Sequence, residues 1–186
     1  MTPMDIAHPE LRSLLLSRIR DVPDYPQPGV VFKDITPLLA DPGAFGALTE
    51  ALAAVCVRHG ADKVVGLEAR GFILAAPAAA RAGIGFVPVR KAGKLPGATL
   101  VQAYELEYGT AQIEVQEDAF APGDRVLVID DVLATGGTAE ASLQLIRRAG
   151  AEVAAVVVLL ELGFLGGRSR LAPALASAPL EALIAL

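Results

Sequence analysis

The sequence is short of the residues that build the commonest catalytic centres. Its 186 residues include one cysteine, Cys56, and two histidines, His8 and His59. A single cysteine excludes an intrachain disulfide, and the apolar surroundings of Cys56 favour a buried thiol over a nucleophile. Neither histidine has a second ligand at metal-binding spacing. The sequence therefore argues against a histidine-based zinc site and against a serine–histidine–aspartate triad.

The sequence also lacks a long hydrophobic run. Its longest strongly apolar stretch spans residues 153–160, and Glu161 ends it. Eight residues cannot span a bilayer, which needs about 20 in a helix, but they suit a strand that is buried on both faces. Arginines and prolines interrupt the first 30 residues, where a signal peptide would need an apolar core. We therefore expect a cytoplasmic protein without a membrane partner, although its mean hydropathy is +0.49.

There is no excess of positive charge. The formal net charge is −5, from 16 Lys and Arg against 21 Asp and Glu, which argues against a nucleic-acid partner. A small basic pocket for a phosphorylated ligand remains compatible with that balance. The hydrophobic content of 53% predicts a folded chain, and the length suits one domain.

What the sequence does contain is an alternation of short apolar strands with helices, which predicts an α/β fold with a parallel sheet. We expect Pro77 to kink its helix or delay its start. Residues 21–29 contain three prolines, which predict a loop. Residues 90–97 are predicted to form a mobile basic loop. The Ala/Leu-rich residues 172–186 are predicted to pack on the domain or to form part of a dimer surface. The predicted helices are residues 11–19, 44–58, 70–82 and 137–149, the strands are 63–66, 85–89, 125–130 and 152–160, and a β-hairpin covers 99–117.

The most informative stretch is residues 126–138. It reads as an apolar strand, two aspartates, a small-residue loop with two glycines, and a helix. Ligands of open α/β sheets bind beyond the carboxyl ends of strands, and a helix N-terminus favours phosphate. Gly136 and Gly137 allow close backbone approach, while Thr135 and Thr138 add hydroxyl donors. This pattern predicts a phosphate site.

The acidic pair of this stretch, Asp130 and Asp131, should repel a phosphate if both groups were bare anions. We expect them to accept hydrogen bonds from sugar hydroxyls or to lie near Mg²⁺. The alternative is a strand-to-helix turn whose acids cap the helix. A nucleoside-triphosphate P-loop is excluded because no Gly-Lys-Ser/Thr follows the glycines.

This stretch resembles the phosphoribosyl pyrophosphate motif of type I phosphoribosyltransferases. Four further segments resemble the adenine-specific branch of that family, and from about residue 20 to 171 they keep its order and spacing. They are YPQPGVVFKDITP (25–37), EARGF (68–72), RKAGKLPG (90–97) and YELEYGT (104–110). The resemblance implies a type I phosphoribosyltransferase fold in one domain, residues 1–186. Residues 1–37 would form most of a hood, and residues 90–117 a mobile lid with a β-hairpin.

The resemblance also implies ligands for the sugar phosphate. Asp130 and Asp131 would hold the ribose hydroxyls, outside the direct ligands of Mg²⁺. Arg70 would be a fixed catalytic cation for pyrophosphate, its fork suited to phosphate oxygens; the alternative is a surface arginine at a helix start. The 5′-phosphate would lie on Ala134, Thr135, Gly136, Gly137 and Thr138, and the pyrophosphate on the loop of Glu68, Ala69 and Arg70.

The lid would close over pyrophosphate with Arg90, Lys91 and Lys94, which taken alone would form a solvated face. The family counterpart of Arg90 reaches into the neighbouring subunit's site, so a homodimer is implied. Tyr108 belongs to the same lid and would also contact the sugar phosphate.

The proton lost when N9 of adenine is alkylated needs an acceptor, and the resemblance implies Glu107 as the catalytic candidate. Glu105 lies on the same strand face by parity, so the residues alone do not choose between them. A solvated or structural Glu107 is the alternative.

In the hood, the backbones of Val31 and Lys33 would read the edge of adenine. Phe32 belongs to the same segment, and Leu162 would pack on a ring face. Ordinary core packing is the alternative for Val31, Phe32 and Leu162. The family often has arginine where Lys33 stands.

The implied reaction is adenine plus phosphoribosyl pyrophosphate giving AMP plus pyrophosphate, a purine-salvage step that uses Mg²⁺. Two other hypotheses stay open. The base could be a 6-oxopurine such as hypoxanthine, guanine or xanthine, or the chain could be a regulator that binds phosphoribosyl pyrophosphate without catalysis.

Overall fold

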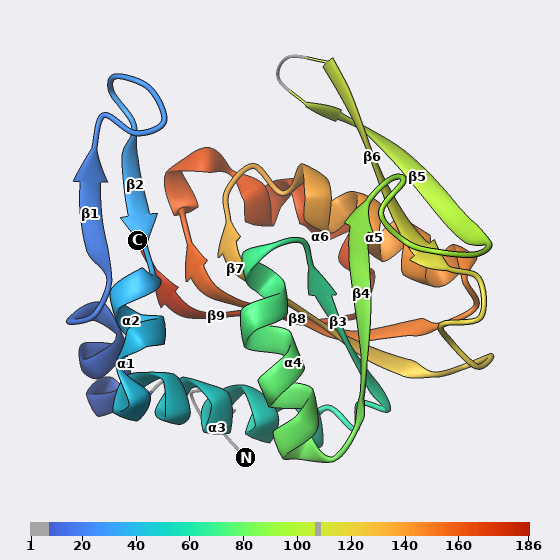
Figure 1. The fold of residues 1–186 in the computed structure, drawn as a ribbon, viewed down its shortest axis with the longest axis horizontal. Helices are drawn as coiled ribbons and strands as arrows, with labels where there is room; N and C mark the ends of the chain where they lie inside the picture. The colour runs from blue at the N-terminus through green and yellow to red at the C-terminus, as the bar shows by residue number, and fades with distance from the viewer. Residues whose placement is uncertain (1–7, 107–108) are drawn as a thin grey trace. The chain divides into compact units, whose positions relative to one another are not determined.

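A computed structural model describes residues 8–106 and 109–186 of the chain. They divide after Ala51 into two compact units. The first unit contains a short antiparallel sheet and three helical segments, of which the last continues into the second unit (Figure 1). Its elements are α1 (Pro9–Leu16), β1 (Arg20–Pro23), β2 (Val31–Asp34), α2 (Thr36–Ala40) and α3 (Pro42–Arg58).

The hairpin of β1 and β2 is held by ion pairs across its two strands. Arg20 binds Asp34 at 2.5 Å, and the Lys33 ammonium lies 2.8 Å from both carboxylate oxygens of Asp21. The prediction of a loop over residues 21–29 is wrong for residues 21–23, which belong to β1. Four-residue strands between prolines carry no period-2 pattern, so cross-strand pairing rather than local sequence defines them.

The second unit is a seven-stranded sheet in the order β5-β6-β4-β3-β7-β8-β9. The neighbours β4, β3, β7, β8 and β9 pair in parallel, whereas β5 pairs with β6 and β6 with β4 in antiparallel fashion. Strands β7 and β8 are buried almost throughout, as expected for parallel strands covered on both faces. The strands are β3 (Lys63–Leu67), β4 (Gly85–Lys91), β5 (Thr99–Leu106), β6 (Gly109–Gln116), β7 (Arg125–Leu133), β8 (Glu152–Glu161) and β9 (Leu180–Ala185).

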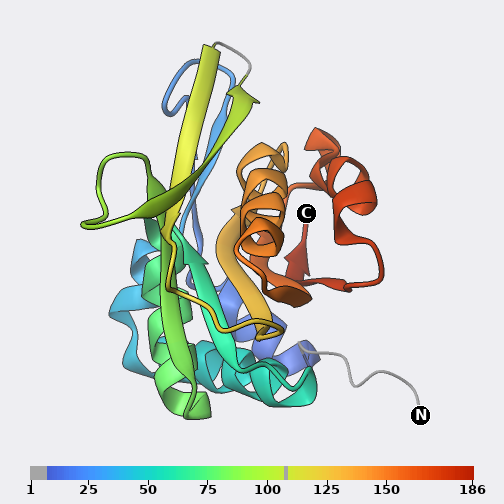
Figure 2. The same cartoon turned by 90° about the vertical axis from the view of Figure 1, so that its right-hand side faces the viewer.

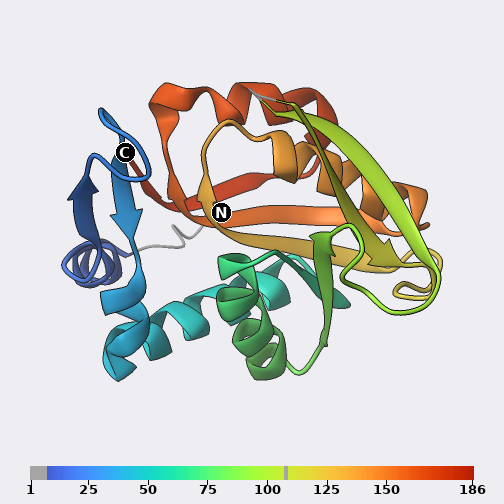
Figure 3. The same ribbon diagram turned by 45° about the horizontal axis from the view of Figure 1, so that its top comes forward.

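Helices cover both faces of this sheet (Figure 2). Helix α4 (Arg70–Ala82) packs on β3 and β7, whereas α5 (Gly137–Arg148) and α6 (Gly167–Leu175) pack together on the opposite face, and a 3-10 turn, η1 (Gly163–Leu165), precedes α6. The hairpin of β5 and β6 lies beside α5 (Figure 3). The predicted alternation of strands and helices is therefore confirmed.

Helix α4 corrects the expectation about Pro77. The helix begins at Arg70 and continues through Pro77, so a delayed start is wrong. An internal proline costs a helix about 3 kcal/mol. The face that carries Leu74, Ala75 and Ala78 is buried on both sides of Pro77, and this burial stabilises the continuous helix.

The C-terminal segment belongs to the sheet. Residues 180–185 form β9, which pairs in parallel with β8, and Leu183 and Ile184 are buried. An Ala/Leu-rich composition does not favour a strand, so this pairing had no local signal. No helix in the described part of the chain has the length and apolar character needed to cross a membrane.

The packing of α5 on the sheet predicts the effect of truncating its core. Leu143 is fully buried, so Leu143→Ala should lower the free energy of unfolding by about 2–5 kcal/mol, measured by urea denaturation. Val57 is 71% exposed, and Val57→Ala should change the free energy of unfolding by less than about 0.5 kcal/mol. Equal effects of the two substitutions would contradict this assignment of the core.

Candidate active site

The predicted site residues of the second unit meet at one edge of the sheet. The chain passes from β3 to β4 on one side and from β7 through β8 to β9 on the other, so the connections change direction between β3 and β7. Ligands of open α/β sheets bind beyond the carboxyl ends of the strands at such a point. Glu68 follows β3, Ala134 follows β7 and Leu162 follows β8, so three parallel strands deliver their loops to the same edge.

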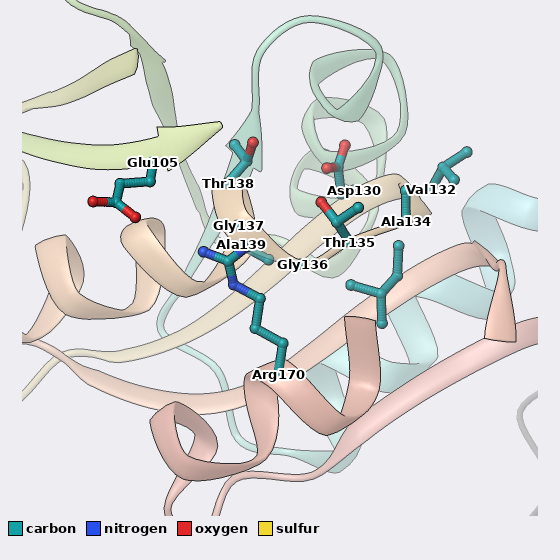
Figure 4. A pocket seen from close by; sticks show the side chains of 11 residues that line it. Glu105, Asp130, Val132, Ala134, Thr135, Gly136, Gly137, Thr138, Ala139 and Arg170 are labelled. Carbon is teal, nitrogen blue, oxygen red and sulfur yellow. The ribbon is translucent and has the colours of Figure 1, made fainter. Parts of the chain in front are cut away.

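A cavity of about 710 Å³ opens at this edge. All five residues predicted to hold the 5′-phosphate line it, together with Asp130 (Figure 4). Sequence reasoning did not assign Arg170 and weighed Glu105 only as an alternative to Glu107, yet both line the cavity. The complete lining is Glu105, Asp130, Val132, Leu133, Ala134, Thr135, Gly136, Gly137, Thr138, Ala139 and Arg170.

The loop between β7 and α5 has the geometry of an anion site. Gly136 has a φ of +83°, a left-handed conformation that glycine adopts without strain, and it is the N-cap of α5. No side chain caps the first turn of this twelve-residue helix. The first N–H groups of α5 therefore face the cavity edge without a side-chain acceptor, and they suit a phosphate.

This loop takes its shape from close packing against the start of α6. A Cβ on Gly167 would lie 2.2 Å from the carbonyl oxygen of Ala134, and one on Gly136 would lie 2.6 Å from Leu171 Cδ1. Helix α6 is itself anchored to the end of β8, because Arg168 donates two hydrogen bonds to Glu161, at 2.8 and 2.5 Å. Gly136 and Gly167, one from each glycine pair of the chain, are thus parts of one packed structure.

The acidic pair at the end of β7 is balanced by its surroundings. Arg70 Nε donates to the buried Asp131 at 2.5 Å, and the Asp131 N–H donates to Asp130 Oδ1 at 2.9 Å. Burial first, and then the neighbouring charge of Asp131, raise the pKa of Asp130 well above its ordinary value. A Cβ on Gly71 would lie 2.8 Å from that same Oδ1. Arg70 therefore offsets part of the pair's negative charge, which reduces its repulsion of a phosphate.

The structure also brings the predicted pyrophosphate loop and lid cations together. Glu68 accepts hydrogen bonds from Lys94 Nζ at 2.6 Å, from the Lys91 N–H at 2.8 Å and from Arg90 at 3.5 Å. Burial raises the pKa of Glu68, but the hydrogen bonds from Lys94, Lys91 and Arg90 outweigh it and lower the pKa to about 2. Ala69 follows Glu68 through a cis peptide.

The buried carboxylate of Glu114 holds the lid from the other side. It accepts the N–H groups of Lys94 and Leu95, each at 2.7 Å. Glu114 thus fixes the lid backbone, while Glu68 contacts the charged groups of Arg90 and Lys94, which the family resemblance assigns to pyrophosphate.

The hairpin contributes a contact to the phosphate loop that sequence reasoning missed. Thr138 Oγ1 donates to the hydroxyl of Tyr104 at 3.1 Å. Tyr104 stands in the same motif as Glu107 and Tyr108, and that motif was its only signal. Glu107 and Tyr108 themselves lie outside the described residues, so their roles stay predictions.

The residues predicted to bind adenine fall in both units. Val31 is half exposed, and Phe32 packs edge-on against Tyr25 with ring centroids 5.2 Å apart. The Lys33 side chain is engaged by Asp21. In the second unit, the Leu162 N–H donates to the carbonyl of Leu133 at 3.0 Å, which ties the end of β8 to the end of β7.

Among residues 8–106 and 109–186, no group of three or more His, Cys, Asp or Glu side chains could hold a metal ion. Asp130 and Asp131 remain the carboxylates beside the phosphate loop. Carboxylate oxygens suit Mg²⁺, which usually keeps several waters and binds through one or two carboxylates together with substrate phosphates. The residues present fit an ion that arrives with a phosphorylated substrate.

Comparison with known proteins identifies close relatives. A model of the phosphoribosyl transferase domain matches residues 39–173. The adenine phosphoribosyltransferase of Streptomyces avermitilis is 78% identical over 174 residues, which are 94% of this chain and 96% of that protein. These matches confirm the family predicted from the motifs.

Solved structures give the same result for the fold. The adenine phosphoribosyltransferase of Rhodothermus marinus is 49% identical, with a TM-score of 0.88 over 96% of this chain and 100% of that one. The Saccharomyces cerevisiae enzyme, complexed with D-2,5-dideoxy-2,5-imino-altritol 1,6-bisphosphate and adenine, is 36% identical, with a TM-score of 0.87 over 94% and 98% of the two chains. The predicted type I phosphoribosyltransferase fold is therefore confirmed.

The contact between α6 and the phosphate loop yields a prediction. Gly167→Ala places a methyl group 2.2 Å from a backbone oxygen, so the loop or the helix must move. We expect a loss of about 1–3 kcal/mol in unfolding free energy and weaker phosphate binding, measured by thermal denaturation and calorimetry. Gly46→Ala in α3 is the control, since a Cβ there meets nothing within 4 Å and Gly46 has no positive φ. Unchanged phosphate affinity in Gly167→Ala would show that α6 does not shape the loop.

Proposed function

This chain belongs to the adenine phosphoribosyltransferase family, and from that membership we propose that it joins adenine to phosphoribosyl pyrophosphate, giving AMP and pyrophosphate. It is then a pentosyltransferase of purine salvage, built as one domain over residues 1–186. The observation that carries the proposal is the phosphate loop at the end of β7, beside the paired aspartates and the cavity of about 710 Å³.

The sugar phosphate occupies the edge of the sheet. The backbone of residues 134–138 and the hydroxyls of Thr135 and Thr138 bind the 5′-phosphate. Asp130 and Asp131 accept hydrogen bonds from the ribose hydroxyls. The Arg70 contact of Asp131 supports this role, because it offsets negative charge beside the phosphate.

The pyrophosphate leaving group replaces Glu68 as the partner of the lid cations. Pyrophosphate leaves C1′ with the electrons of the C–O bond, and Arg70, Arg90, Lys91 and Lys94 bind the resulting anion. Glu68 now faces the lid cations, so pyrophosphate exchanges one set of ion pairs for another. Mg²⁺, when bound, would be held by substrate oxygens near Asp130 and Asp131 and would neutralise part of the leaving group's charge. Lid closure excludes water, which otherwise hydrolyses the activated sugar.

The adenine contacts are proposed from the family resemblance. The backbone groups of Val31 and Lys33 read the edge of the base, with Phe32 beside them, and Leu162 packs on a ring face. Because Asp21 engages the Lys33 side chain, recognition by the backbone is favoured over a side-chain contact at this position. N9 bonds to C1′ and loses its proton, for which Glu107 is the proposed acceptor, with Tyr108 beside it in the lid.

We also propose that the enzyme is a homodimer in which Arg90 serves the neighbouring subunit's site. Phosphoribosyl pyrophosphate and AMP are highly charged and do not cross membranes unaided, which favours a cytoplasmic location. Light scattering tests the dimer, and mixing an Arg90→Ala chain with a chain inactivated at Arg70 tests the shared site. Recovery of activity in the mixture would support it, whereas no recovery from a mixed dimer would contradict it.

The reaction is tested by supplying phosphoribosyl pyrophosphate and Mg²⁺ with adenine, hypoxanthine, guanine or xanthine in parallel. We expect AMP and pyrophosphate from adenine alone, detected by chromatography. Product from a 6-oxopurine would contradict the assigned base. Tight binding of the sugar phosphate without any product would instead indicate a regulator.

The two glutamates of the lid hairpin give a separate prediction. Glu107→Gln should lower kcat by about 10²–10⁴-fold if this carboxylate handles the proton, with little effect on the melting temperature. Glu105→Gln is the matched control, since it removes the same charge two residues away, and we expect a change of only a few fold. A larger loss in Glu105→Gln, whose carboxylate lines the cavity, would transfer the role to Glu105.

A further inference from the structure

Arg170 is a cation that the phosphate motif does not include. It lies on α6 and rises toward the glycines of the phosphate loop (Figure 4). A Cβ built on Gly137 would lie 3.3–3.4 Å from three atoms of its guanidinium group. The guanidinium therefore sits directly against the loop backbone, at the first residue of α5.

One neighbour sets the orientation of this guanidinium. Arg170 Nε donates to Glu140 Oε2 at 2.8 Å. The two terminal nitrogens have no hydrogen-bond partner in the part of the chain that the structure describes. Since the guanidinium is planar and Nε is fixed, the ion pair with Glu140 leaves the outer edge of the fork available to a ligand in the cavity.

The charges around the cavity explain why a cation is needed there. Arg170 is the one cation among the described residues that line it, whereas Glu105 and Asp130 are acidic. The phosphate loop itself offers only neutral donors. A phosphate monoester carries about −1.5 to −2 charges at pH 7, so neutral donors and one helix N-terminus leave most of this charge unbalanced.

We propose that Arg170 is a specificity-determining residue for the 5′-phosphate. Its terminal nitrogens donate charge-assisted hydrogen bonds to the phosphate and so select a phosphorylated sugar over an unphosphorylated one. Glu140 is a positioning residue, which acts by holding the fork. This inference rests on the proposed function for the identity of the ligand.

Ribose 5-phosphate is the probe, because it carries the phosphate but no base. Arg170→Gln removes charge-assisted hydrogen bonds to the phosphate, so it should weaken ribose 5-phosphate binding by about 10- to 100-fold in calorimetry. Affinity for adenine, which has no phosphate, should not change. Arg147→Gln is the matched control, since it removes the same charge from an exposed side chain in the last turn of α5, away from the phosphate loop. It should leave ribose 5-phosphate affinity within a few fold.

Two further measurements separate a direct contact from a structural role. Wild-type affinity for ribose 5-phosphate should fall from pH 7.5 to 5.5 as the phosphate is protonated near pH 6, and this dependence should be weaker in Arg170→Gln. Glu140→Ala should also weaken binding, and Glu140→Gln should restore it, because the amide oxygen still accepts from Nε.

Equal ribose 5-phosphate affinities in the wild type and Arg170→Gln would overturn the proposal, whether or not adenine is turned over. Conversely, wild-type protein that binds ribose 5-phosphate but makes no AMP would contradict the proposed reaction. The Arg170 comparison would still be decided in that case, so the two failures are distinguishable.

Discussion

The parallel pairing of β7 with β3 and β8 is the constraint on which the site depends. Parallel strands end at the same edge, so this pairing places residues 68–70, 130–138 and 162 together although they are far apart in sequence. Strands buried on both faces pair with few alternatives, because a register slip would expose apolar side chains or bury the acids. The acids of β7 are thereby held at the strand end, where Arg70 and a polar ligand can reach them.

Charge around the site is compensated locally. Asp131 contacts Arg70, Glu68 contacts Lys94 and Arg90, and Glu140 contacts Arg170. Arg70, Arg90, Lys94 and Arg170 each have an internal carboxylate within reach, so these cations do not form a cluster of unpaired like charges. Such pairs are partly exposed and individually weak. They can therefore be exchanged for a highly charged ligand at low cost, which suits a site that must both bind and release pyrophosphate.

The strand–loop–helix core of the site could be predicted from the sequence. Residues 126–138 predicted the strand, the phosphate loop and the helix, because buried apolar runs, glycines and helix starts are local signals. The elements that it missed are short or form by pairing with distant residues; they are β1, β2, α2, η1, α6 and β9. Pro77 was misjudged for a related reason: the burial that stabilises α4 across it is a tertiary effect, which local propensity cannot contain.

The same distinction explains which site residues escaped sequence reasoning. Tyr104 reaches Thr138 from a hairpin 34 residues away, and Arg170 lies over Gly137 from a helix that follows another strand. Nothing in the local sequence of Arg170 separates it from Arg168, which stands two residues earlier and turns instead to Glu161. The difference follows from the close packing of Gly167 on Ala134, because that contact brings α6 near enough for one of the two arginines to face the loop. Gly167, which lies outside the phosphate motif, thus helps to bring this charge to the cavity.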